Sequence, residues 1–465
     1  MKPATTLAFS GAVHDQIKQH LFPGDGLEAA AILLCARTPQ PRTRLIVRSV
    51  ILVPHKACAR RTPDAITWPG EYLEEAIDRG ETEGLVLILI HSHPGGLYAF
   101  SDIDDTSDRT VLPSLFQAFG SLHGSAIMTP DGAVRARLYS PAMEVRGVDV
   151  VTVAGDDLVF WWLDSATLMG PAERPMAFTS LMTQELGRLT AVVIGVSGTG
   201  SIVAEQLARM GFGLVLLIDF DRVEGKNLNR ILNTTLEDAK AGRLKVDAFA
   251  GAVATYRGPG VATPIAASIT ERDAVLAASQ ADVLFSCVDT LEARQIADLI
   301  ASAFLIPLFD LGVVVPVRKT VKGVAIADVY GRIDYVQPGG STLQDRGVYS
   351  PESLRAEYLQ RVAPDEHRGE LEAGYIKGVV EEAPSVITLN MRAASACANE
   401  LIARLYPFRL EPNHLYARTQ FSLAACEEEY VAEGEFTRSP SSTLGRGDTE
   451  PLLGLPSLKP KKATR

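Results

Sequence analysis

Residues 191–200 read AVVIGVSGTG, and they decide the fold of the larger part of the chain. The apolar run 191–194 predicts a buried strand, and the glycine-rich stretch 195–200 predicts a tight turn that leads into a helix over 201–210. A second apolar strand follows at 214–218. Strand, glycine turn, helix and strand in this order predict a βαβ unit, in which the two strands run parallel in one sheet.

Apolar stretches on both sides of this unit give the rest of the fold. Residues 281–286 and 307–311 predict further buried strands, so we expect the parallel sheet to continue to about residue 400. Short apolar strands mixed with helices before residue 150 predict an α+β unit. We therefore expect an α/β protein with a first domain over 1–150, a linker over 151–180, a Rossmann-like, mostly parallel second domain over 181–430, and a loosely ordered tail over 431–465.

Size and charge exclude several functional classes. A chain of 465 residues exceeds the size at which one core keeps growing, which favours two domains. The net charge of −11 works against a nucleic-acid partner, which requires a basic surface. The longest apolar runs, such as 85–90, are far shorter than the roughly 20 residues of a membrane span. Without a secretion signal in the sequence, we expect a cytoplasmic protein with no membrane partner.

A possible metal site follows the apolar run 85–90. His91 and His93 are two residues apart in an extended segment, so both imidazoles can face one ion. Ser101 then predicts a helix cap, with Asp104 in the first turn. Two histidines and one carboxylate leave one zinc coordination position open, as in catalytic sites. Glu28, just ahead of a predicted strand, is our candidate general base.

These residues resemble the signature of the JAMM (JAB/MPN) metalloproteases, which is a Glu before a strand, His-x-His, seven residues, and Ser-x-x-Asp. The resemblance implies that His91, His93 and Asp104 bind Zn²⁺, that Glu28 is catalytic, and that Ser101 stabilises the oxyanion. It also implies cleavage after the C-terminus of a ubiquitin-like protein. The alternative is a surface His-x-His with an unrelated helix cap.

A possible nucleotide site begins at the glycine turn. Gly195, Ser197, Gly198 and Gly200 lie where backbone N–H groups can approach phosphates at a helix N-terminus. Asp219, at the end of the next strand, can accept hydrogen bonds from ribose hydroxyls. An NAD-dependent dehydrogenase would share these features, so the residues that follow have to distinguish the two.

Those residues resemble the ThiF/MoeB and ubiquitin-activating adenylyltransferases. The resemblance implies that Asp219 binds ribose, that Asn227, Arg230 and Lys245 contact phosphates, and that Asp289 is linked to Mg²⁺. Attack of a carboxylate on ATP brings like charges together, so cations must screen them in the transition state. The same resemblance implies a homodimer, in which Arg174 of one subunit reaches into the nucleotide site of the other. The segments that carry this resemblance are 219–224, which includes Asp221, 227–230, 242–245 and 287–289.

Two features depart from the family pattern. Ser197 replaces a glycine that many relatives have in the loop, and no Cys-x-x-Cys pair follows Gly340. No cysteine is recognisable as a thioester-forming residue, because the five cysteines resemble structural thiols. Cys426 is the least improbable candidate for that role.

Together these features predict a bifunctional enzyme of a bacterial ubiquitin-like pathway. One half would process or deconjugate a β-grasp carrier protein, and the other would adenylate the carrier's C-terminal carboxylate with ATP and Mg²⁺. A conjugating enzyme or a sulfur donor would be a further partner, and the resemblance to such fusions implies a role in antiviral defence. Two alternatives are sulfur-carrier activation and a non-catalytic scaffold that presents the carrier to the peptidase, while a dehydrogenase ranks third.

Overall fold

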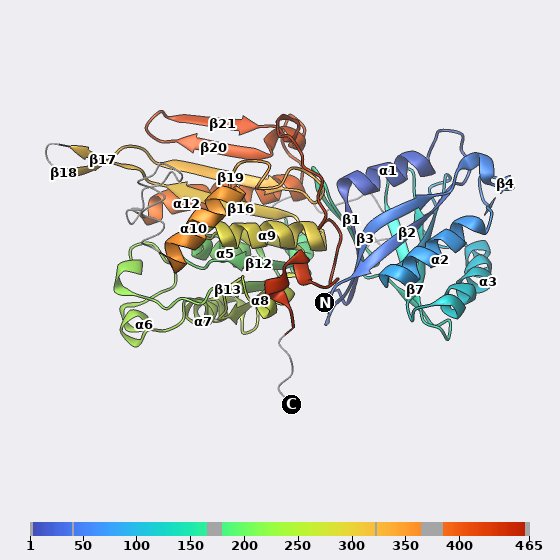
Figure 1. Cartoon of the computed structure of the whole chain (residues 1–465), viewed down its shortest axis with the longest axis horizontal. Coiled ribbons are helices and arrows are strands. Elements are labelled where there is room, and N and C mark those ends of the chain that lie inside the picture. Colours follow the sequence, from blue (N-terminus) through green and yellow to red (C-terminus); the bar gives the residue numbers. More distant parts are fainter. Residues whose placement is uncertain (1–2, 40, 165–178, 321–322, 364–384, 461–465) are drawn as a thin grey trace.

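The computed structural model describes residues 3–39, 41–164, 179–320, 323–363 and 385–460. Two large sheets lie side by side, with β1 and β3 of the first sheet on the side that faces the second (Figure 1). Both sheets are mixed and both carry helices, which confirms the predicted α/β class. Among the described residues, no helix combines the length and apolarity required to cross a lipid bilayer.

The first sheet has nine strands in the order β11-β10-β1-β3-β2-β6-β7-β8-β9. Its centre is β2, whose sequence AAILLCAR is buried almost throughout, as expected for a strand covered on both faces. Helix α1 (Gly11–Leu21) packs on one face, and α2 (Glu71–Glu83) and α3 (Asp102–Ala118) pack on the other. The strands are β1 (Thr5–Ser10), β2 (Ala30–Arg37), β3 (Thr43–Leu52), β6 (Val86–Ser92), β7 (His123–Met128), β8 (Val134–Tyr139), β9 (Val145–Gly147), β10 (Val150–Ala154) and β11 (Leu158–Trp162).

The predicted linker over 151–180 is wrong in its first part. Strands β10 and β11 pair antiparallel around Gly155, and β10 pairs parallel with β1. Their sequences VVTVA and LVFWW are rich in β-branched and aromatic residues, which fit a pleated, buried surface better than a connector. The remainder of the predicted linker, 165–178, lies outside the described residues.

The second sheet has eight strands in the order β14-β13-β12-β15-β16-β19-β20-β21, of which the first five are parallel. The four strands predicted around the glycine turn are present as β12, β13, β15 and β16. The strands are β12 (Thr190–Ile194), β13 (Leu214–Ile218), β14 (Ala262–Ile265), β15 (Val283–Ser286), β16 (Leu308–Val314), β19 (Tyr330–Val336), β20 (Arg418–Ser422) and β21 (Glu427–Val431). Two hairpins stand apart from the sheets, β4 (Arg60–Arg61) with β5 (Ile66–Thr67), and β17 (Val317–Thr320) with β18 (Gly323–Ile326).

Helices cover both faces of the second sheet. One core contains apolar residues of α5, α7 and α12, and the core on the other face contains those of α8 and α9. The helices are α4 (Ser180–Leu186), α5 (Gly198–Met210), α6 (Leu236–Ala241), α7 (Lys245–Arg257), α8 (Arg272–Ala278), α9 (Leu291–Phe304), α10 (Pro351–Val362) and α12 (Ile387–Leu405).

Residues 431–460 do not form the loosely ordered tail that their composition predicted, and the rest of that tail, 461–465, lies outside the described residues. Leu452, Leu453 and Leu458 are buried in the core that α8 and α9 share. The backbone N–H of Gly447 donates to the carbonyl of Ala303, and the next N–H donates to Arg37 in the first sheet. We call residues 439–458 the strap, because they contact both halves of the chain. Three leucines supply the buried apolar area that orders this segment.

Candidate functional site

The metal-type residues predicted in the first half converge at one end of its sheet. His91 lies near the end of β6, where it pairs with Ala30 at the start of β2. The Nε2 atoms of His91 and His93 lie 3.1 Å apart. The Asp104 carboxylate is 2.9 Å from Nε2 of His91 and 3.4 Å from Nε2 of His93. Ligand atoms about 2.0–2.1 Å from a tetrahedral zinc ion lie about 3.4 Å from one another, so these spacings fit the ion.

A backbone carbonyl orients one imidazole of this cluster. Nδ1 of His93 lies 2.8 Å from the Leu97 carbonyl, which selects the tautomer that carries its hydrogen on Nδ1. The lone pair of Nε2 is then directed toward the cluster, as in metal-binding histidines. Burial opposes a charge on His93, but hydrogen bonds to Asp104 and Leu97 outweigh it, so the pKa of His93 is raised.

Glu28 is held beside the two imidazoles by the β4–β5 hairpin. Its N–H donates to the Thr62 carbonyl at 2.9 Å, and its carbonyl accepts from Nε of Arg61 at 2.8 Å. The ligand-type atoms of Glu28, His91 and His93 all lie within 4.8 Å of one another. Burial raises the pKa of Glu28, while the two histidines oppose the rise. Sequence reasoning missed Arg61, because its role depends on a contact with the main chain.

Ser101 caps helix α3 as predicted, and its hydroxyl also binds Asp104. The Asp104 N–H donates to Oγ of Ser101 at 3.2 Å, and that hydroxyl donates to the Asp104 carboxylate at 2.9 Å. The cap fixes the first turn of the helix and directs Asp104 toward the histidines. Burial works against ionisation of Asp104, but hydrogen bonds to His91 and His93 hold its pKa well below the usual range.

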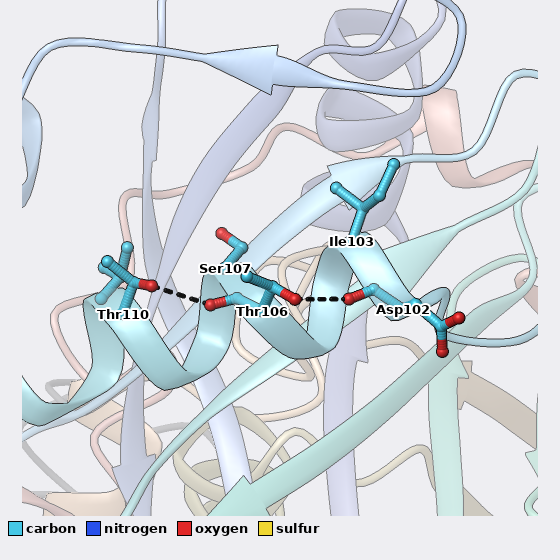
Figure 2. Close-up of a pocket in the computed structure, with 6 residues that line it drawn as sticks. Asp102, Ile103, Thr106, Ser107 and Thr110 are labelled. Carbon is cyan, nitrogen blue, oxygen red and sulfur yellow. Dashed lines mark hydrogen bonds between the residues drawn. The ribbon is translucent and has the colours of Figure 1, made fainter.

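A separate shallow hollow of about 500 Å³ lies along the outer side of α3. Its lining comes from a single helix, as Figure 2 shows for Asp102, Ile103, Thr106, Ser107 and Thr110. The Thr106 and Thr110 hydroxyls donate to backbone carbonyls one turn earlier, at 2.9 and 2.8 Å. Because their hydroxyl hydrogens are already used within the helix, we assign this hollow no function.

In the second half, a cavity of about 1240 Å³ opens at the carboxyl ends of β12, β13 and β15. Its lining includes nearly every residue predicted for nucleotide binding, while Gly200 lies behind the loop. These lining residues are Gly195, Ser197, Gly198, Asp219, Asp221, Asn227, Arg230, Lys245 and Asp289. A cavity of this size at the end of a parallel sheet is where nucleotides bind in such folds.

Three glycines of the loop are required by close contacts or by backbone angle. Gly195 has a φ of +83°, a Cβ on Gly200 would lie 1.7 Å from the Gly195 carbonyl oxygen, and a Cβ on Gly198 would lie 2.3 Å from Nδ2 of Asn390. Ser197 has a φ of −104°, which is outside the left-handed region. The φ angle at this position therefore does not require the glycine that the family resemblance predicted.

Asp219 supports the loop through two backbone hydrogen bonds. Its carboxylate accepts from the N–H groups of Val196 and Asp221, both at 2.8 Å. Burial raises the pKa of Asp219, and Lys245 together with these two donors opposes the rise. Through these bonds Asp219 ties the glycine turn to the end of β13.

The cations of the cavity differ in their partners. Nζ of Lys245 lies 2.7 Å from the Asp221 carboxylate. Arg230 donates to the Lys226 carbonyl and to Oδ1 of Asn229, and in the described part of the chain it makes no ion pair. Its charge is therefore available to an anionic ligand. Asp289, just after β15, is exposed to the cavity. Arg174 lies outside the described residues.

Sequence reasoning missed Asn390. This buried side chain comes from the first turn of α12, lines the cavity, and packs against the glycine loop. Its Nδ2 atom donates to Oγ of Ser385 at 3.1 Å. About 190 residues separate Asn390 from the loop, and no local motif marks it; only the packing of α12 on α5 brings the two together.

The second half matches a known family. The model of the ThiF family matches residues 173–429, which is more than half of the chain. The chain belongs to the ThiF family. A second model, for prokaryotic homologues of the JAB domain, matches residues 10–139, so an N-terminal JAB-like domain precedes the ThiF domain.

Curated relatives and solved structures match part of the chain. Ubiquitin-like modifier-activating enzyme 5 of Bombyx mori is 29% identical over 169 residues, which are 34% of this chain and 39% of that protein. The enzyme of the same name from Caenorhabditis briggsae is 31% identical over 32% of this chain and 34% of that protein. The chain thus spans under half the length of these curated relatives. The crystal structure of E. coli MccB with MccA-N7isoASN covers 57% of this chain and 69% of that chain, at 19% identity and a TM-score of 0.43.

The cysteines give the ThiF domain no activated thiol at its cavity. Among the described residues, Cys287 alone of the cysteines lines the cavity. Burial raises the pKa of Cys287 to about 12, so its thiol is protonated at neutral pH. Cys35 and Cys397 are also buried. Cys426 is exposed in the turn between β20 and β21 and does not line the cavity.

Proposed function

We propose that this chain processes a ubiquitin-like carrier protein at a zinc peptidase site and adenylates the carrier's C-terminal carboxylate at the ThiF site. Each half supplies one observation in support. In the JAB-like domain it is the convergence of Glu28, His91, His93 and Asp104. In the ThiF domain it is the cavity in which Arg230 has no carboxylate partner among the residues that the structure describes.

In the peptidase half, His91, His93 and Asp104 would hold the zinc ion. Bound zinc would act as a Lewis acid toward the carbonyl of the scissile bond. Glu28, buried beside the histidines, would take a proton from the attacking water and pass it to the leaving amine. Its raised pKa favours this role, because a carboxylate of higher pKa is a stronger base. Ser101 would donate to the oxyanion, after exchanging its bond to Asp104 for one to the substrate.

In the ThiF half, the carrier carboxylate would attack the α-phosphorus of ATP. A carboxyl oxygen–phosphorus bond forms, the bond to the bridging oxygen breaks, and pyrophosphate leaves with the electron pair. Arg230 and Lys245 would neutralise the charge that gathers on the phosphates, and Asp289 would hold Mg²⁺. Backbone N–H groups of the glycine loop would face the phosphates at the start of α5.

A specific observation bears on what happens to the adenylate. The one cysteine at the cavity among the described residues has a pKa of about 12, which does not suit a nucleophile. A second candidate function is therefore sulfur-carrier activation, in which the adenylate passes to a separate sulfur donor. A conjugating enzyme that accepts the carrier directly from the adenylate would likewise need no cysteine nucleophile on this chain.

The test of the proposal measures each half on the zinc-loaded full chain. The probe is the β-grasp protein that co-purifies with the Glu28→Gln chain, expressed with and without a C-terminal extension. We expect removal of the extension by the wild-type chain and not by Glu28→Gln. We also expect ATP–pyrophosphate exchange that requires the mature probe and is lost in Asp289→Ala. Exchange that is absent at saturating Mg²⁺ would support the scaffold alternative, in which the ThiF domain only presents the carrier.

A further inference from the structure

The position of the metal cluster in the first sheet is fixed by strand pairing. Ala30 pairs with His91, and Ala31 pairs with Leu52, the last residue of β3. The cluster therefore lies at the end of the sheet where β3 finishes. The other end of β3, at Thr43, follows directly on Arg42, which contacts the ThiF domain. Strand β3 has 10 residues, and at about 3.3 Å per residue it places about 30 Å between the cluster and the domain junction.

The nucleotide cavity lies at the end of the second sheet that points away from the domain junction. The junction uses Ala281 and Asp282, which immediately precede β15, and Leu305, which closely precedes β16. These positions are at the amino ends of parallel strands. The cavity lies at the carboxyl ends, beside Gly195 and Cys287. Strand β15 adds about 10 Å along its own direction, so the strands that lead from the cluster through the junction to the cavity sum to about 40 Å, and each site lies at the end of its sheet that points away from the junction.

The junction between the two halves is built as an interior. Nη1 of Arg42 lies 2.8 Å from the buried Asp282 carboxylate, and Arg44 donates to the carbonyls of Ala281 and Leu305. Burial lowers the pKa of Arg44 to about 10. Ile46 belongs to the ThiF core on one face. Opening this junction would expose apolar surface and separate a buried ion pair, so it is not a hinge.

Further contacts hold the halves together away from the two arginines. Phe160 and Trp162 of β11 pack in the ThiF core on the other face of its sheet. The Tyr335 hydroxyl donates to the Gly155 carbonyl at 2.5 Å. The strap adds hydrogen bonds to Arg37 and Ala303. Apolar packing, a buried ion pair and a strap make the two domains one rigid unit with its sites at opposite ends.

From this geometry we infer that a carrier processed at the metal cluster is released into solution before it is adenylated. The inference rests on the proposed function of each half. A tail that bridged about 40 Å would need a dozen extended residues, since a chain spans at most about 3.3–3.6 Å per residue. It would also have to run around the outside of both sheets. Cleavage must precede adenylation, because it frees the carboxylate that ATP then activates. The carrier that one chain has cleaved can then be adenylated by another chain.

A chase experiment tests this inference on the wild-type, zinc-loaded full chain. The substrate is the ¹⁵N-labelled co-purifying β-grasp probe with its C-terminal extension, with ATP and Mg²⁺, and a tenfold excess of unlabelled mature probe is added at the start. Mass spectrometry after an acid quench measures the labelled and unlabelled adenylates. We expect the labelled adenylate to fall about tenfold, in proportion to its dilution. Labelled adenylate that is unaffected by the chase would show direct transfer and overturn the inference.

A mixing experiment adds an independent readout. Equal amounts of Glu28→Gln and Asp289→Ala chains provide one intact site each, and each variant's remaining activity shows that it is folded. At matched concentrations of intact sites, we expect the mixture to make adenylate from precursor as fast as the wild type. A clearly slower mixture would overturn the inference. If either activity is missing from the wild-type chain, the proposed function fails instead, and the two failures are distinguishable.

Discussion

Arg42 of the JAB-like domain donates a 2.8 Å hydrogen bond to Asp282 of the ThiF domain, and both side chains are buried. The Asp282 carboxylate also accepts from the Thr190 N–H at the start of β12. This ion pair joins two residues that are 240 positions apart in the sequence. The pair joins the first sheet directly to the amino ends of the second.

Asp282→Ala is expected to destabilise the whole chain, because it leaves the Arg42 guanidinium buried without its partner. Removing one member of a buried pair lowers the free energy of unfolding by about 3–5 kcal/mol. Chemical denaturation of the full chain measures the change. The matched control is Glu292→Ala, which breaks the exposed pair with Arg361 and should change stability by under about 1 kcal/mol. Equal effects of the two variants would contradict this account of the junction.

Asp104→Ala is expected to abolish stoichiometric zinc binding, because it removes one of three protein ligands and the anchor of both imidazoles. Metal analysis of the purified protein after dialysis against zinc gives the readout. His414→Ala is the control, since His414 is half-exposed and far from the cluster in sequence. Full zinc occupancy in Asp104→Ala would show that this carboxylate is not a ligand.

Arg230→Ala is expected to slow ATP–pyrophosphate exchange by about 10²–10³-fold, the loss typical for one preorganised charge in a transition state. Arg243→Ala serves as control, because Arg243 pairs with Asp238 and does not line the cavity. Exchange rates at saturating ATP and Mg²⁺ separate the two variants. If both retain wild-type exchange, Arg230 has no role in the chemistry.

Gly200→Ala is expected to disrupt the loop, because the new Cβ would lie 1.7 Å from the Gly195 carbonyl oxygen. Helix α5 must shift away from β12 to admit it, which should lower both the melting temperature and nucleotide binding. Gly225→Ala is the control, because a Cβ there meets nothing within 4 Å. Thermal unfolding and binding of a non-hydrolysable ATP analogue by calorimetry measure the two effects. Unchanged nucleotide binding in Gly200→Ala would contradict the geometry of the turn.

The buried carboxyl group of Asp298 is expected to make the stability of the folded chain depend on pH. Burial raises the pKa of Asp298 from 3.8 to about 7, although Tyr349 and the Leu343 N–H donate to its carboxylate. Between about pH 4 and 7 the folded chain keeps a proton that the unfolded chain has lost. The contribution of Asp298 to stability therefore falls as pH rises through this window. The melting temperature of Asp298→Asn relative to wild type should increase from pH 5 to 8, and a pH-independent difference would contradict the assignment.

The sequence predicted the βαβ unit, the parallel strands and the residues that converge on each site. These predictions rest on short-range patterns: glycines that a tight turn requires, and two histidines spaced as alternate residues of a strand. The structure brings Glu28 to the histidines and Arg230 to the glycine loop, while the chemical roles of these residues stay predictions. The features that could not be predicted from the sequence depend on long-range packing. Asn390 reaches the loop only because α12 packs on α5, and no periodicity encodes that contact.

The strap and strand β11 decide how this protein can be divided for experiments. A fragment that ends before residue 439 would uncover the pocket that holds Leu452, Leu453 and Leu458, and an isolated JAB-like domain would expose Phe160 and Trp162 to water. Large new apolar patches of this kind promote aggregation. Gene fission between the two domains is therefore a poor route to separate activities, and point substitutions within the intact polypeptide are the appropriate tool.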